Sequence, residues 1–200
     1  MVGCPYEWVD VIAGLVLAAG EGARFGSEPK QLAEFRGRPM LEHAIAAQCH
    51  VPELERVVVV LGAHAKRITA AADFMRAEPV VCERWRDGQS ASLRFGLEAL
   101  HGAEKVLVTL GDQPLITPEV VARLAREPPG SRAVYNGRPG HPVVLGLEQI
   151  EALLSLTGDT GARELLRGGE VELGALGDLA RDIDTPEDLE RLRNEARAVV

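Results

Sequence analysis

The sequence predicts an α/β fold in which helices cover both faces of a mostly parallel sheet. Two observations predict it: segments of strand length alternate with segments of helical period, and the strand segments are apolar on both faces. Val57–Leu61 is the clearest strand, because a short, wholly apolar run that stops at Gly62 suits a strand buried between two helical layers. A chain of 200 residues is long enough for one core. We therefore expect a single domain over residues 12–200, after an N-terminal extension of residues 1–11.

Strand and helix patterns alternate through the first half of the chain. The expected strands are residues 11–17, 57–61, 79–82 and 105–110, and the expected helices are 39–51, 65–76 and 90–100. Pro39 suits the first position of its helix. Ligands of such sheets lie beyond the carboxyl ends of the strands. The loops that follow these strands should therefore line one crevice, and they are residues 17–30, 62–64, 85–92 and 111–112.

The second half of the chain is less regular. A helix should begin at Thr117-Pro118, where a cap precedes a proline. A last helix should run from Thr185 to about Ala196, because Thr185 and Asp188 form a capping box. The other expected elements are short strands at 133–135 and 143–145 and helices at 148–156 and 161–167.

Composition and charge exclude several classes of protein. The net charge of −8 argues against broad binding to nucleic acid or to an acidic membrane surface. Cys4, Cys49 and Cys82 lack the spacing of a metal site, so we expect reduced thiols. The N-terminus has no basic region of a signal peptide, and no apolar run reaches the ~18 residues of a membrane span. We expect a cytoplasmic protein.

The loop LAAGEGARFGSEPK, residues 17–30, carries three glycines directly after the first strand. A dinucleotide fingerprint would need a helix to begin in the loop and an acidic residue to end the second strand, but Pro29 interrupts the loop and the second strand ends in Gly62. A Walker A loop would need lysine directly after the last glycine, Gly26, and that position is Ser27. Both interpretations are therefore weak.

A loop that wraps a triphosphate is the third interpretation. Gly20 and Gly22 let backbone N–H groups turn inward, and Arg24 and Lys30 supply positive charge for the phosphates. A loop whose charges merely face solvent is the structural alternative.

Five further motifs make the whole chain resemble the MobA-like nucleotidyltransferases, and in particular the molybdenum cofactor cytidylyltransferases. This resemblance implies a three-layer, Rossmann-like nucleotidyltransferase fold with a mostly parallel central sheet. It covers about residues 12 to 192. After the glycine loop, the motifs are WRDGQSASLRFGL (85–97), LGDQPLIT (110–117), GRPGHPV (137–143), LTGDTGARELL (156–166) and DIDTPEDL (182–189).

The resemblance also implies a role for individual residues. Arg24, Lys30 and Asp112 would be catalytic, and Asp112 and Asp184 would hold Mg²⁺, or Mn²⁺ in its place. His141, Asp159 and Arg163 would contact the acceptor. The implied nucleotide-binding residues are Leu17, Ala18, Ala19, Gly20, Gly22, Arg24, Lys30, Gly88, Ser90, Ser92 and Asp112.

Four of these residues have a structural alternative. Asp112 could be a turn residue of Gly-Asp-Gln-Pro, and Asp184 could belong to the lead-in of the last helix. His141 could be structural, and Arg163 could pair with Asp159.

The activity that the resemblance implies is transfer of CMP, or alternatively GMP, from the nucleotide to the terminal phosphate of molybdopterin. Ala19 favours CTP, because the guanylyltransferase branch typically has glycine there. The run Ser90-Ala91-Ser92 departs slightly from the family's serine pair. A transferase acting on a sugar or polyol phosphate is one alternative. A non-catalytic maturation factor for a molybdenum hydroxylase apoenzyme is another.

Overall fold

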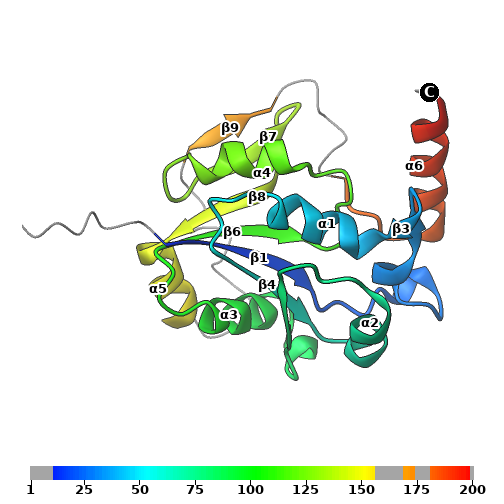
Figure 1. Ribbon diagram of the computed structural model, residues 1–200, viewed down its shortest axis with the longest axis horizontal. Helices are drawn as coiled ribbons and strands as arrows, with labels where there is room; N and C mark the ends of the chain where they lie inside the picture. Colours follow the sequence, from blue (N-terminus) through cyan, green and yellow to red (C-terminus); the bar gives the residue numbers. More distant parts are fainter. Residues whose placement is uncertain (1–10, 156–168, 174–180, 199–200) are drawn as a thin grey trace, which may run out of the picture.

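The computed structural model describes residues 11–155, 169–173 and 181–198, and it confirms the α/β architecture (Figure 1). One seven-stranded sheet runs in the order β5-β4-β1-β6-β8-β7-β9, and its first four strands are parallel. β8 runs antiparallel to both of its neighbours, β6 and β7, and β9 pairs parallel with β7. All the described strands of this sheet except β8 therefore run in the same direction, and the sheet is mostly parallel. The strands are β1 (Ile12–Ala18), β4 (Arg56–Leu61), β5 (Glu78–Val81), β6 (Lys105–Leu110), β7 (Arg132–Tyr135), β8 (Arg138–Gly146) and β9 (Glu170–Glu172).

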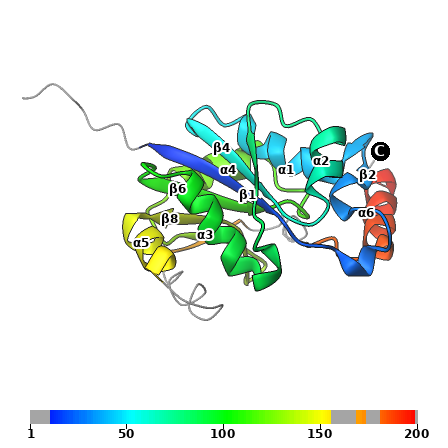
Figure 2. The same ribbon diagram turned by 90° about the horizontal axis from the view of Figure 1, so that it is seen from below.

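Helices cover both faces of this sheet. α1 (Met40–Cys49), α2 (Ala65–Ala71) and α4 (Pro118–Ala125) pack on one face, and α3 (Gln89–Ala99) and α5 (Leu147–Ser155) pack on the other. Seen from below, α3 and α5 lie in front of the strands (Figure 2). The strands are apolar on both sides because each side meets a helical layer.

The order of the strands creates a switch point between β1 and β6. The chain builds outward from β1 to β4 and β5, and then crosses back to place β6 on the other side of β1. Leu17 pairs with Leu110 at the carboxyl ends of the two central strands. Loops that leave two such strands in opposite directions open a crevice between them, and ligands of doubly wound sheets bind there.

A buried glutamine joins α1 to the two central strands. The Gln48 side chain is completely buried, and its Nε2 donates to the carbonyl oxygens of Leu15 and Leu107 and to Thr109 Oγ1, at 2.8 Å from the latter. A Cβ on Gly14 would lie 2.0 Å from Gln48 Oε1, so the glycine makes room for this amide. Gln48 therefore holds the sheet together on the face covered by α1.

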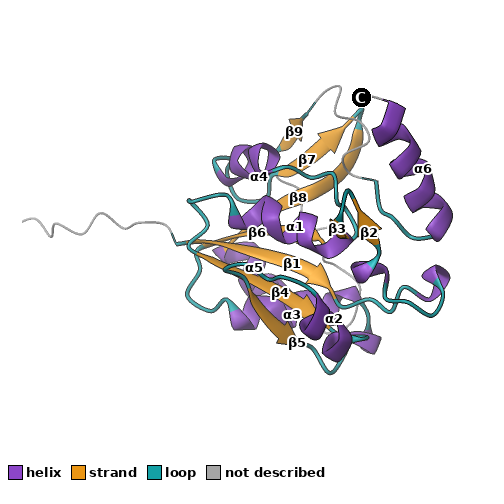
Figure 3. Cartoon of the chain, turned by 45° about the vertical axis from the view of Figure 1, so that its right-hand side comes forward, coloured by secondary structure: helices purple, strands orange, loops and turns teal. Residues whose placement is uncertain are grey.

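α6 (Pro186–Ala198) stands beside the carboxyl ends of the central strands (Figures 1 and 3). Its capping box is confirmed: Thr185 N donates to Asp188 Oδ2 at 3.0 Å, and Asp188 N donates to Thr185 Oγ1 at 3.1 Å. The helix packs against a hairpin of β2 (Glu34–Phe35) and β3 (Arg38–Pro39). Their shared cluster contains Phe35, Met40, Ile183, Leu189 and Leu192.

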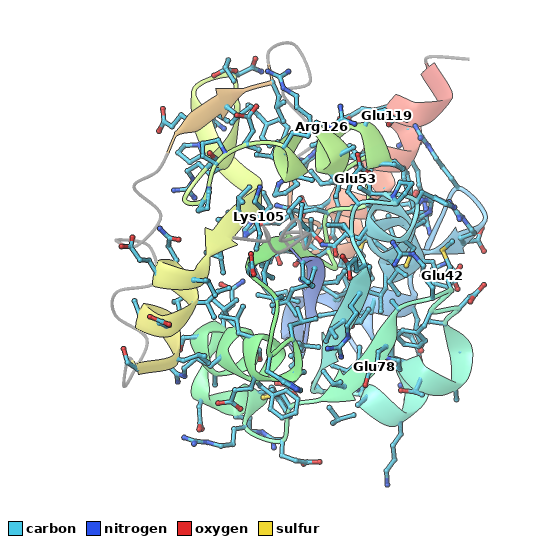
Figure 4. The ribbon with its side chains drawn as sticks, turned by 60° about the vertical axis from the view of Figure 1, so that its left-hand side comes forward. Glu42, Glu53, Glu78, Lys105, Glu119 and Arg126 are labelled. Carbon is cyan, nitrogen blue, oxygen red and sulfur yellow. The ribbon has the colours of Figure 1, made fainter. Side chains whose placement is uncertain are left out.

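Charged side chains hold the end of α4 near the amino end of β6, away from the carboxyl ends of the strands (Figure 4). Lys105, the first residue of β6, donates from Nζ to the carbonyl oxygens of Ala125 and Glu127, where α4 ends. Arg126 pairs with Glu53 at 3.0 Å. Cations near the last carbonyls of a helix stabilise its end. This end of the sheet is therefore structural, whereas the carboxyl end is available for a ligand.

Two elements differ clearly in extent from those expected from the sequence, and three short strands were not expected. The helix expected at 65–76 ends at Ala71, because Asp73 Oδ1 accepts a hydrogen bond from Met75 N, and Met75 has φ 51°. The strand expected at 143–145 extends over the whole of β8, since the GRPGHP stretch pairs with β7. The β2-β3 hairpin and β9 carried too few residues to be recognised. The helix expected at 161–167 lies outside the described residues.

Within the described ranges, the structure contains no helix with the length and apolar character of a membrane-spanning segment.

Gly96 lets α3 approach the sheet, and we predict that Gly96→Ala destabilises the protein. A Cβ there would lie 2.5 Å from Leu15 Cδ1 and 2.8 Å from Val60 Cγ2, both fully buried. The overpacking should exceed the gain in helix propensity and lower the free energy of unfolding by roughly 1 to 2 kcal/mol. Chemical denaturation measures the change. Glu98→Ala, at an exposed position of the same helix, is the control and should change this free energy by less than about 0.5 kcal/mol. An equally stable Gly96→Ala protein would contradict the close packing.

Candidate active site

A cavity of about 570 Å³ opens at the switch point, between the loops that follow β1 and β6. Its floor is formed by the carboxyl ends of these strands, and one wall by the start of α3. The lining residues are Leu17, Ala18, Ala19, Gly20, Glu21, Lys30, Gln31, Trp85, Arg86, Gly88, Gln89, Ser92, Leu110, Gly111 and Asp112.

Most of the nucleotide-binding residues expected from the sequence line this cavity. They are Leu17, Ala18, Ala19, Gly20, Lys30, Gly88, Ser92 and Asp112. Gly22, Arg24 and Ser90 lie outside the lining; Gly22 and Ser90 are each adjacent in the chain to a lining residue, and Arg24 pairs with Asp184. Glu21 and Arg86 lie in the loops that were expected to line the crevice but had no individual role, and Gln31, directly after the glycine loop, was missed. Trp85, the first residue of the loop expected at 85–92, also lines the cavity.

The loop after β4 does not line the cavity, contrary to the expectation that four loops would share it. A Cβ on Gly62 would lie 2.7 Å from the carbonyl oxygen of Ala19 and 2.6 Å from Trp85 Cβ. Ala63 N donates to the same Ala19 oxygen at 3.0 Å. The loop therefore lies behind the glycine loop and supports it, and three loops rather than four form the cavity.

The glycine loop contains no α-helix, as expected, but it contains two short 3₁₀ turns, Ala23–Phe25 and Lys30–Leu32. Gly22 has φ 65°, a left-handed conformation that starts the first turn, and its Cα faces the stem of Lys30. A Cβ there would lie 3.0 Å from Lys30 Cγ. The glycine thus lets the loop fold back over the lysine.

A chain of alternating charges joins the glycine loop to the loops before α6 and after β6. Lys30 Nζ lies 2.5 Å from Asp112 Oδ2 and 3.2 Å from Asp184 Oδ1, and Arg24 pairs with Asp184 at 2.7 Å. The Lys30 side chain is only 11% exposed. Burial by itself would lower the pKa of Lys30, but the attraction of Asp112 and Asp184 outweighs it, so this pKa is raised. Lys30 is therefore held as a cation.

The segment before α6 is fixed to the loop after β6 by its backbone as well. Ile183 N donates to the carbonyl oxygen of Asp112 at 3.0 Å, and Gln113 Nε2 donates to Asp182 Oδ1 at 2.8 Å. Burial, followed by the nearby charge of Asp112, raises the pKa of Asp182. These contacts bring Asp184 beside Asp112, although the two residues lie 72 positions apart in the sequence.

The donor set of Asp112 and Asp184 fits a divalent cation. One lysine ammonium already lies within hydrogen-bond distance of both carboxylates, which shows that their oxygens converge on a single positive group. Asp112 Oδ1 is buried and has no hydrogen-bond partner among the described residues. Mg²⁺ is typically held by one or two carboxylates together with water and phosphate oxygens. No group of three or more metal-binding side chains occurs in the described part of the chain, so phosphate and water oxygens would complete the coordination.

Trp85 and Arg86 form part of the cavity wall on the side of α3. Arg86 Cζ lies 4.3 Å from the centre of the Trp85 ring, a cation–π contact. Both residues belong to the 3₁₀ turn Trp85–Asp87, which leads through Gly88 into α3. This wall therefore contains a guanidinium stacked on an indole ring.

His141, expected to contact the acceptor, lies on β8 and outside the cavity lining. Its backbone carbonyl accepts a hydrogen bond from Tyr135 Oη at 2.6 Å. Burial, and then the charge of Arg132, lowers the pKa of His141 to about 4. The acceptor role of His141 stays a prediction, and Asp159 and Arg163 lie outside the described residues.

Comparison with known families agrees with this geometry. Residues 14–176 match the MobA-like NTP transferase domain. The chain belongs to this family. Membership supports an enzyme of the nucleotidyltransferase type, and the sheet-end cavity lies within the matched range.

Three solved structures, of two proteins, share the fold over nearly the whole chain. Rv0371c from Mycobacterium tuberculosis H37Rv superposes with a TM-score of 0.81 at 30% identity, covering 93% of this chain and 99% of that one. A second structure of Rv0371c, in complex with manganese, gives a TM-score of 0.76 at 28% identity, covering 92% and 98%. A nucleotidyl transferase from Methanothermobacter thermautotroptrophicus gives 0.78 at 26% identity, covering 96% and 100%.

A relative with a different named activity matches the sequence over a similar length. Nicotine blue oxidoreductase from Paenarthrobacter nicotinovorans is 36% identical over 200 aligned residues, which cover 90% of this chain and 96% of the relative. The family therefore contains proteins named for two different kinds of chemistry.

The low pKa of His141 predicts an acid-sensitive contribution to stability. The unfolded state binds a proton below about pH 6.5 and the folded state only near pH 4, so the free energy of unfolding should fall as the pH is lowered between these values. His141 retains some exposure, so we expect a loss of roughly 1 to 3 kcal/mol from this residue. Urea denaturation at pH 7 and pH 4.5 measures this loss. The free energy of unfolding should differ less between the two pH values in His141→Asn than in the wild type. Identical pH dependence in the two proteins would contradict the burial of a neutral histidine.

Proposed function

We propose that the protein is a Mg²⁺-dependent nucleotidyltransferase that transfers CMP, or alternatively GMP, to the terminal phosphate of the molybdopterin cofactor. One observation carries the proposal: the cavity at the switch point combines a glycine loop with a buried lysine and a pair of converging carboxylates. A nucleoside triphosphate needs both features, since its phosphates are anionic and are bound together with a divalent cation.

The proposed reaction is an in-line displacement at the α-phosphorus of the nucleotide. An oxygen of the acceptor phosphate forms the new bond, the bond to the β-phosphate breaks, and pyrophosphate leaves with the electron pair. The acceptor phosphate is already anionic, so no strong general base is required. Lys30 and Arg24 would offset the charge of the phosphates, and the backbone of residues 17–20 would position the nucleoside.

Asp112 and Asp184 would hold the Mg²⁺. When bound, the ion neutralises phosphate charge and orients the phosphates. Mn²⁺ is a candidate as well, because a Rv0371c structure contains manganese. Lys30 bridges the two carboxylates, so it is placed to contact the phosphates that approach the ion.

The choice of base rests on two positions in the cavity. Ala19, where the guanylyltransferase branch typically has glycine, favours CTP. Ser92 is 4% exposed and lines the cavity at the start of α3, where a hydroxyl can meet the edge of the base. GTP is the alternative nucleotide.

The acceptor is proposed from the sequence motifs alone. His141, Asp159 and Arg163 would contact molybdopterin, and a molybdenum hydroxylase apoenzyme would receive the product. A sugar or polyol phosphate is the alternative acceptor, and a non-catalytic maturation factor is the alternative role.

A second candidate function is oxidation or reduction of a substrate, which the name of the Paenarthrobacter relative favours. The ligand that we consider for this function is a nicotinamide dinucleotide. Two features of the site oppose it. β4 ends in Leu61-Gly62 rather than in an acidic residue that would hold a ribose, and no α-helix starts in the glycine loop. The same cavity would nevertheless have room for part of a dinucleotide.

A thermal-shift panel with Mg²⁺ and CTP, GTP, ATP, UTP or NADPH separates these functions. At a hundred times its dissociation constant, a ligand adds about 2.7 kcal/mol of stability, a shift of roughly 5 to 10 °C for a domain of this size. We expect CTP to give this shift, and EDTA to remove most of it.

Each outcome of the panel has one meaning. A shift with GTP alone would keep the fold and mechanism but overturn the base. A shift with NADPH alone would overturn the transferase function in favour of the reductase. A shift with CTP leads to an assay of pyrophosphate release with molybdopterin as the acceptor.

Asp112→Asn should abolish pyrophosphate release in that assay. The substitution removes one negative charge from the proposed ion site, and we expect the rate to fall by about 10²-fold or more. Acceptor binding, followed by calorimetry, should remain close to that of the wild type. Asp73→Asn, remote from the cavity, is the control and should retain the rate. A fully active Asp112→Asn enzyme would rule out the role of this carboxylate.

A further inference from the structure

The backbone at the end of β1 forms the cavity floor, and neighbouring strands hold part of it. Gly111 N donates to the carbonyl oxygen of Leu17 at 2.9 Å, and Ala63 N donates to that of Ala19 at 3.0 Å. These two bonds come from the loops after β6 and β4. They fix the peptide groups that follow Leu17 and Ala19, which alternate along the floor.

A single side chain binds the carbonyls in between. Gln31 Nε2 donates to the carbonyl oxygen of Ala18 at 3.1 Å and to that of Gly20 at 2.9 Å. Both hydrogens of the amide group are therefore directed at the backbone of the glycine loop. Gln31 is 2% exposed, and it lines the cavity.

The orientation of a carbonyl determines the orientation of the next amide. In a trans peptide, the C=O of one residue and the N–H of the following residue point in opposite directions in one plane. The bonds from Gln31 thus set the direction of the N–H groups of Ala19 and Glu21, and both of these residues line the cavity. These are amides that a nucleotide would meet.

Gln31 directly follows Lys30, the buried cation of the site, in the chain. Lys30 and Gln31 share one 3₁₀ turn, Lys30–Leu32. Lys30 reaches across the cavity to Asp112 and Asp184, while Gln31 reaches back to the floor. The turn is therefore fixed from both sides, and the distance between the lysine ammonium and the floor depends on the glutamine.

The amide oxygen of Gln31 indicates why a glutamine occupies this position: the side chain is needed for its two N–H donors. Gln31 Oε1 is buried without a hydrogen-bond partner among the described residues. An apolar side chain of similar shape would fill the same space without leaving a buried oxygen unsatisfied. Packing by itself would not favour glutamine here, whereas the need to hold two carbonyls would.

We propose that Gln31 is a positioning residue of the nucleotide site, which orients the floor amides and sets the place of Lys30 through its two hydrogen bonds to the glycine loop. It touches no reacting atom. The inference rests on the proposed function to the extent that the ligand of this floor is a nucleoside triphosphate.

Gln31→Met tests this role, and Gln48→Met is its matched control. Both glutamines are buried and donate from Nε2 to carbonyl oxygens of β1 or its extension, but Gln48 lies on the face covered by α1 and does not line the cavity. Methionine keeps the length of the side chain and removes the donors. The measurements are the melting temperature without ligand, its shift with Mg²⁺ and CTP, and the KM and kcat of pyrophosphate release.

We expect the two variants to separate stability from ligand binding. Gln48→Met should lower the melting temperature without ligand and leave the shift with CTP and the KM close to those of the wild type. Gln31→Met should reduce the shift with CTP, and raise KM while lowering kcat, with a combined loss of about 10- to 100-fold in kcat/KM. Gln31→Glu, which presents an acceptor to the same two carbonyls, should lose at least as much.

Two results would overturn the proposal. The first is a set of Gln31 variants that bind CTP and turn over as the wild type does. The second is that the Gln31 variants lose stability, or fail to fold, without a specific loss of CTP binding. Gln31 would then have a purely structural role. A wild-type protein that binds no nucleoside triphosphate would instead overturn the proposed function. The Gln31 comparison would then be repeated with NADPH, the other ligand of the panel.

Discussion

The site depends on one buried ammonium group. Lys30 lies between Asp112 and Asp184 with little access to water, and a charge removed from water is stable in a protein only when opposite charges surround it. The three residues come from the glycine loop, the loop after β6 and the segment before α6. The requirement to neutralise Lys30 therefore connects three distant parts of the chain, and it places them at the sheet edge where a ligand of this fold binds.

Two buried amides add hydrogen bonds to those that the paired strands make with one another. Gln48 bonds to the central strands beneath the sheet, and Gln31 bonds to the backbone beyond the end of β1. Each offers two N–H donors on a flexible stem: Gln48 donates to carbonyl groups within the paired strands, and Gln31 donates to the last carbonyl of β1 and to that of Gly20 beyond it. A backbone held in this way can present its amides to a ligand without reorganising when the ligand arrives.

The chain belongs to a family whose members are named for transfer of nucleotides and for oxidation and reduction. The fold itself does not decide between these chemistries. What distinguishes them is the arrangement of charge: paired carboxylates beside a lysine suit a metal-bound polyphosphate, whereas a dinucleotide site relies on a helix N-terminus and an acidic residue that binds ribose. In this chain the first arrangement is present at the end of β6, and the second is absent from the described loops after β1 and β4.

The sequence by itself determined the layer architecture, because the alternation of apolar strands such as 57–61 with helical periods is local and needs no knowledge of contacts. It also predicted that the glycine loop with Lys30, and Asp112, would lie at the carboxyl end of the sheet, because the loop and Asp112 follow the ends of two strands. It did not reveal that β8 reverses direction, that residues 62–64 lie behind the loop, or that Gln31 binds Ala18 and Gly20. Only the tertiary structure decided those points, because strand direction, the side of a loop that faces a cavity and the partner of a buried amide all depend on residues far away in the chain.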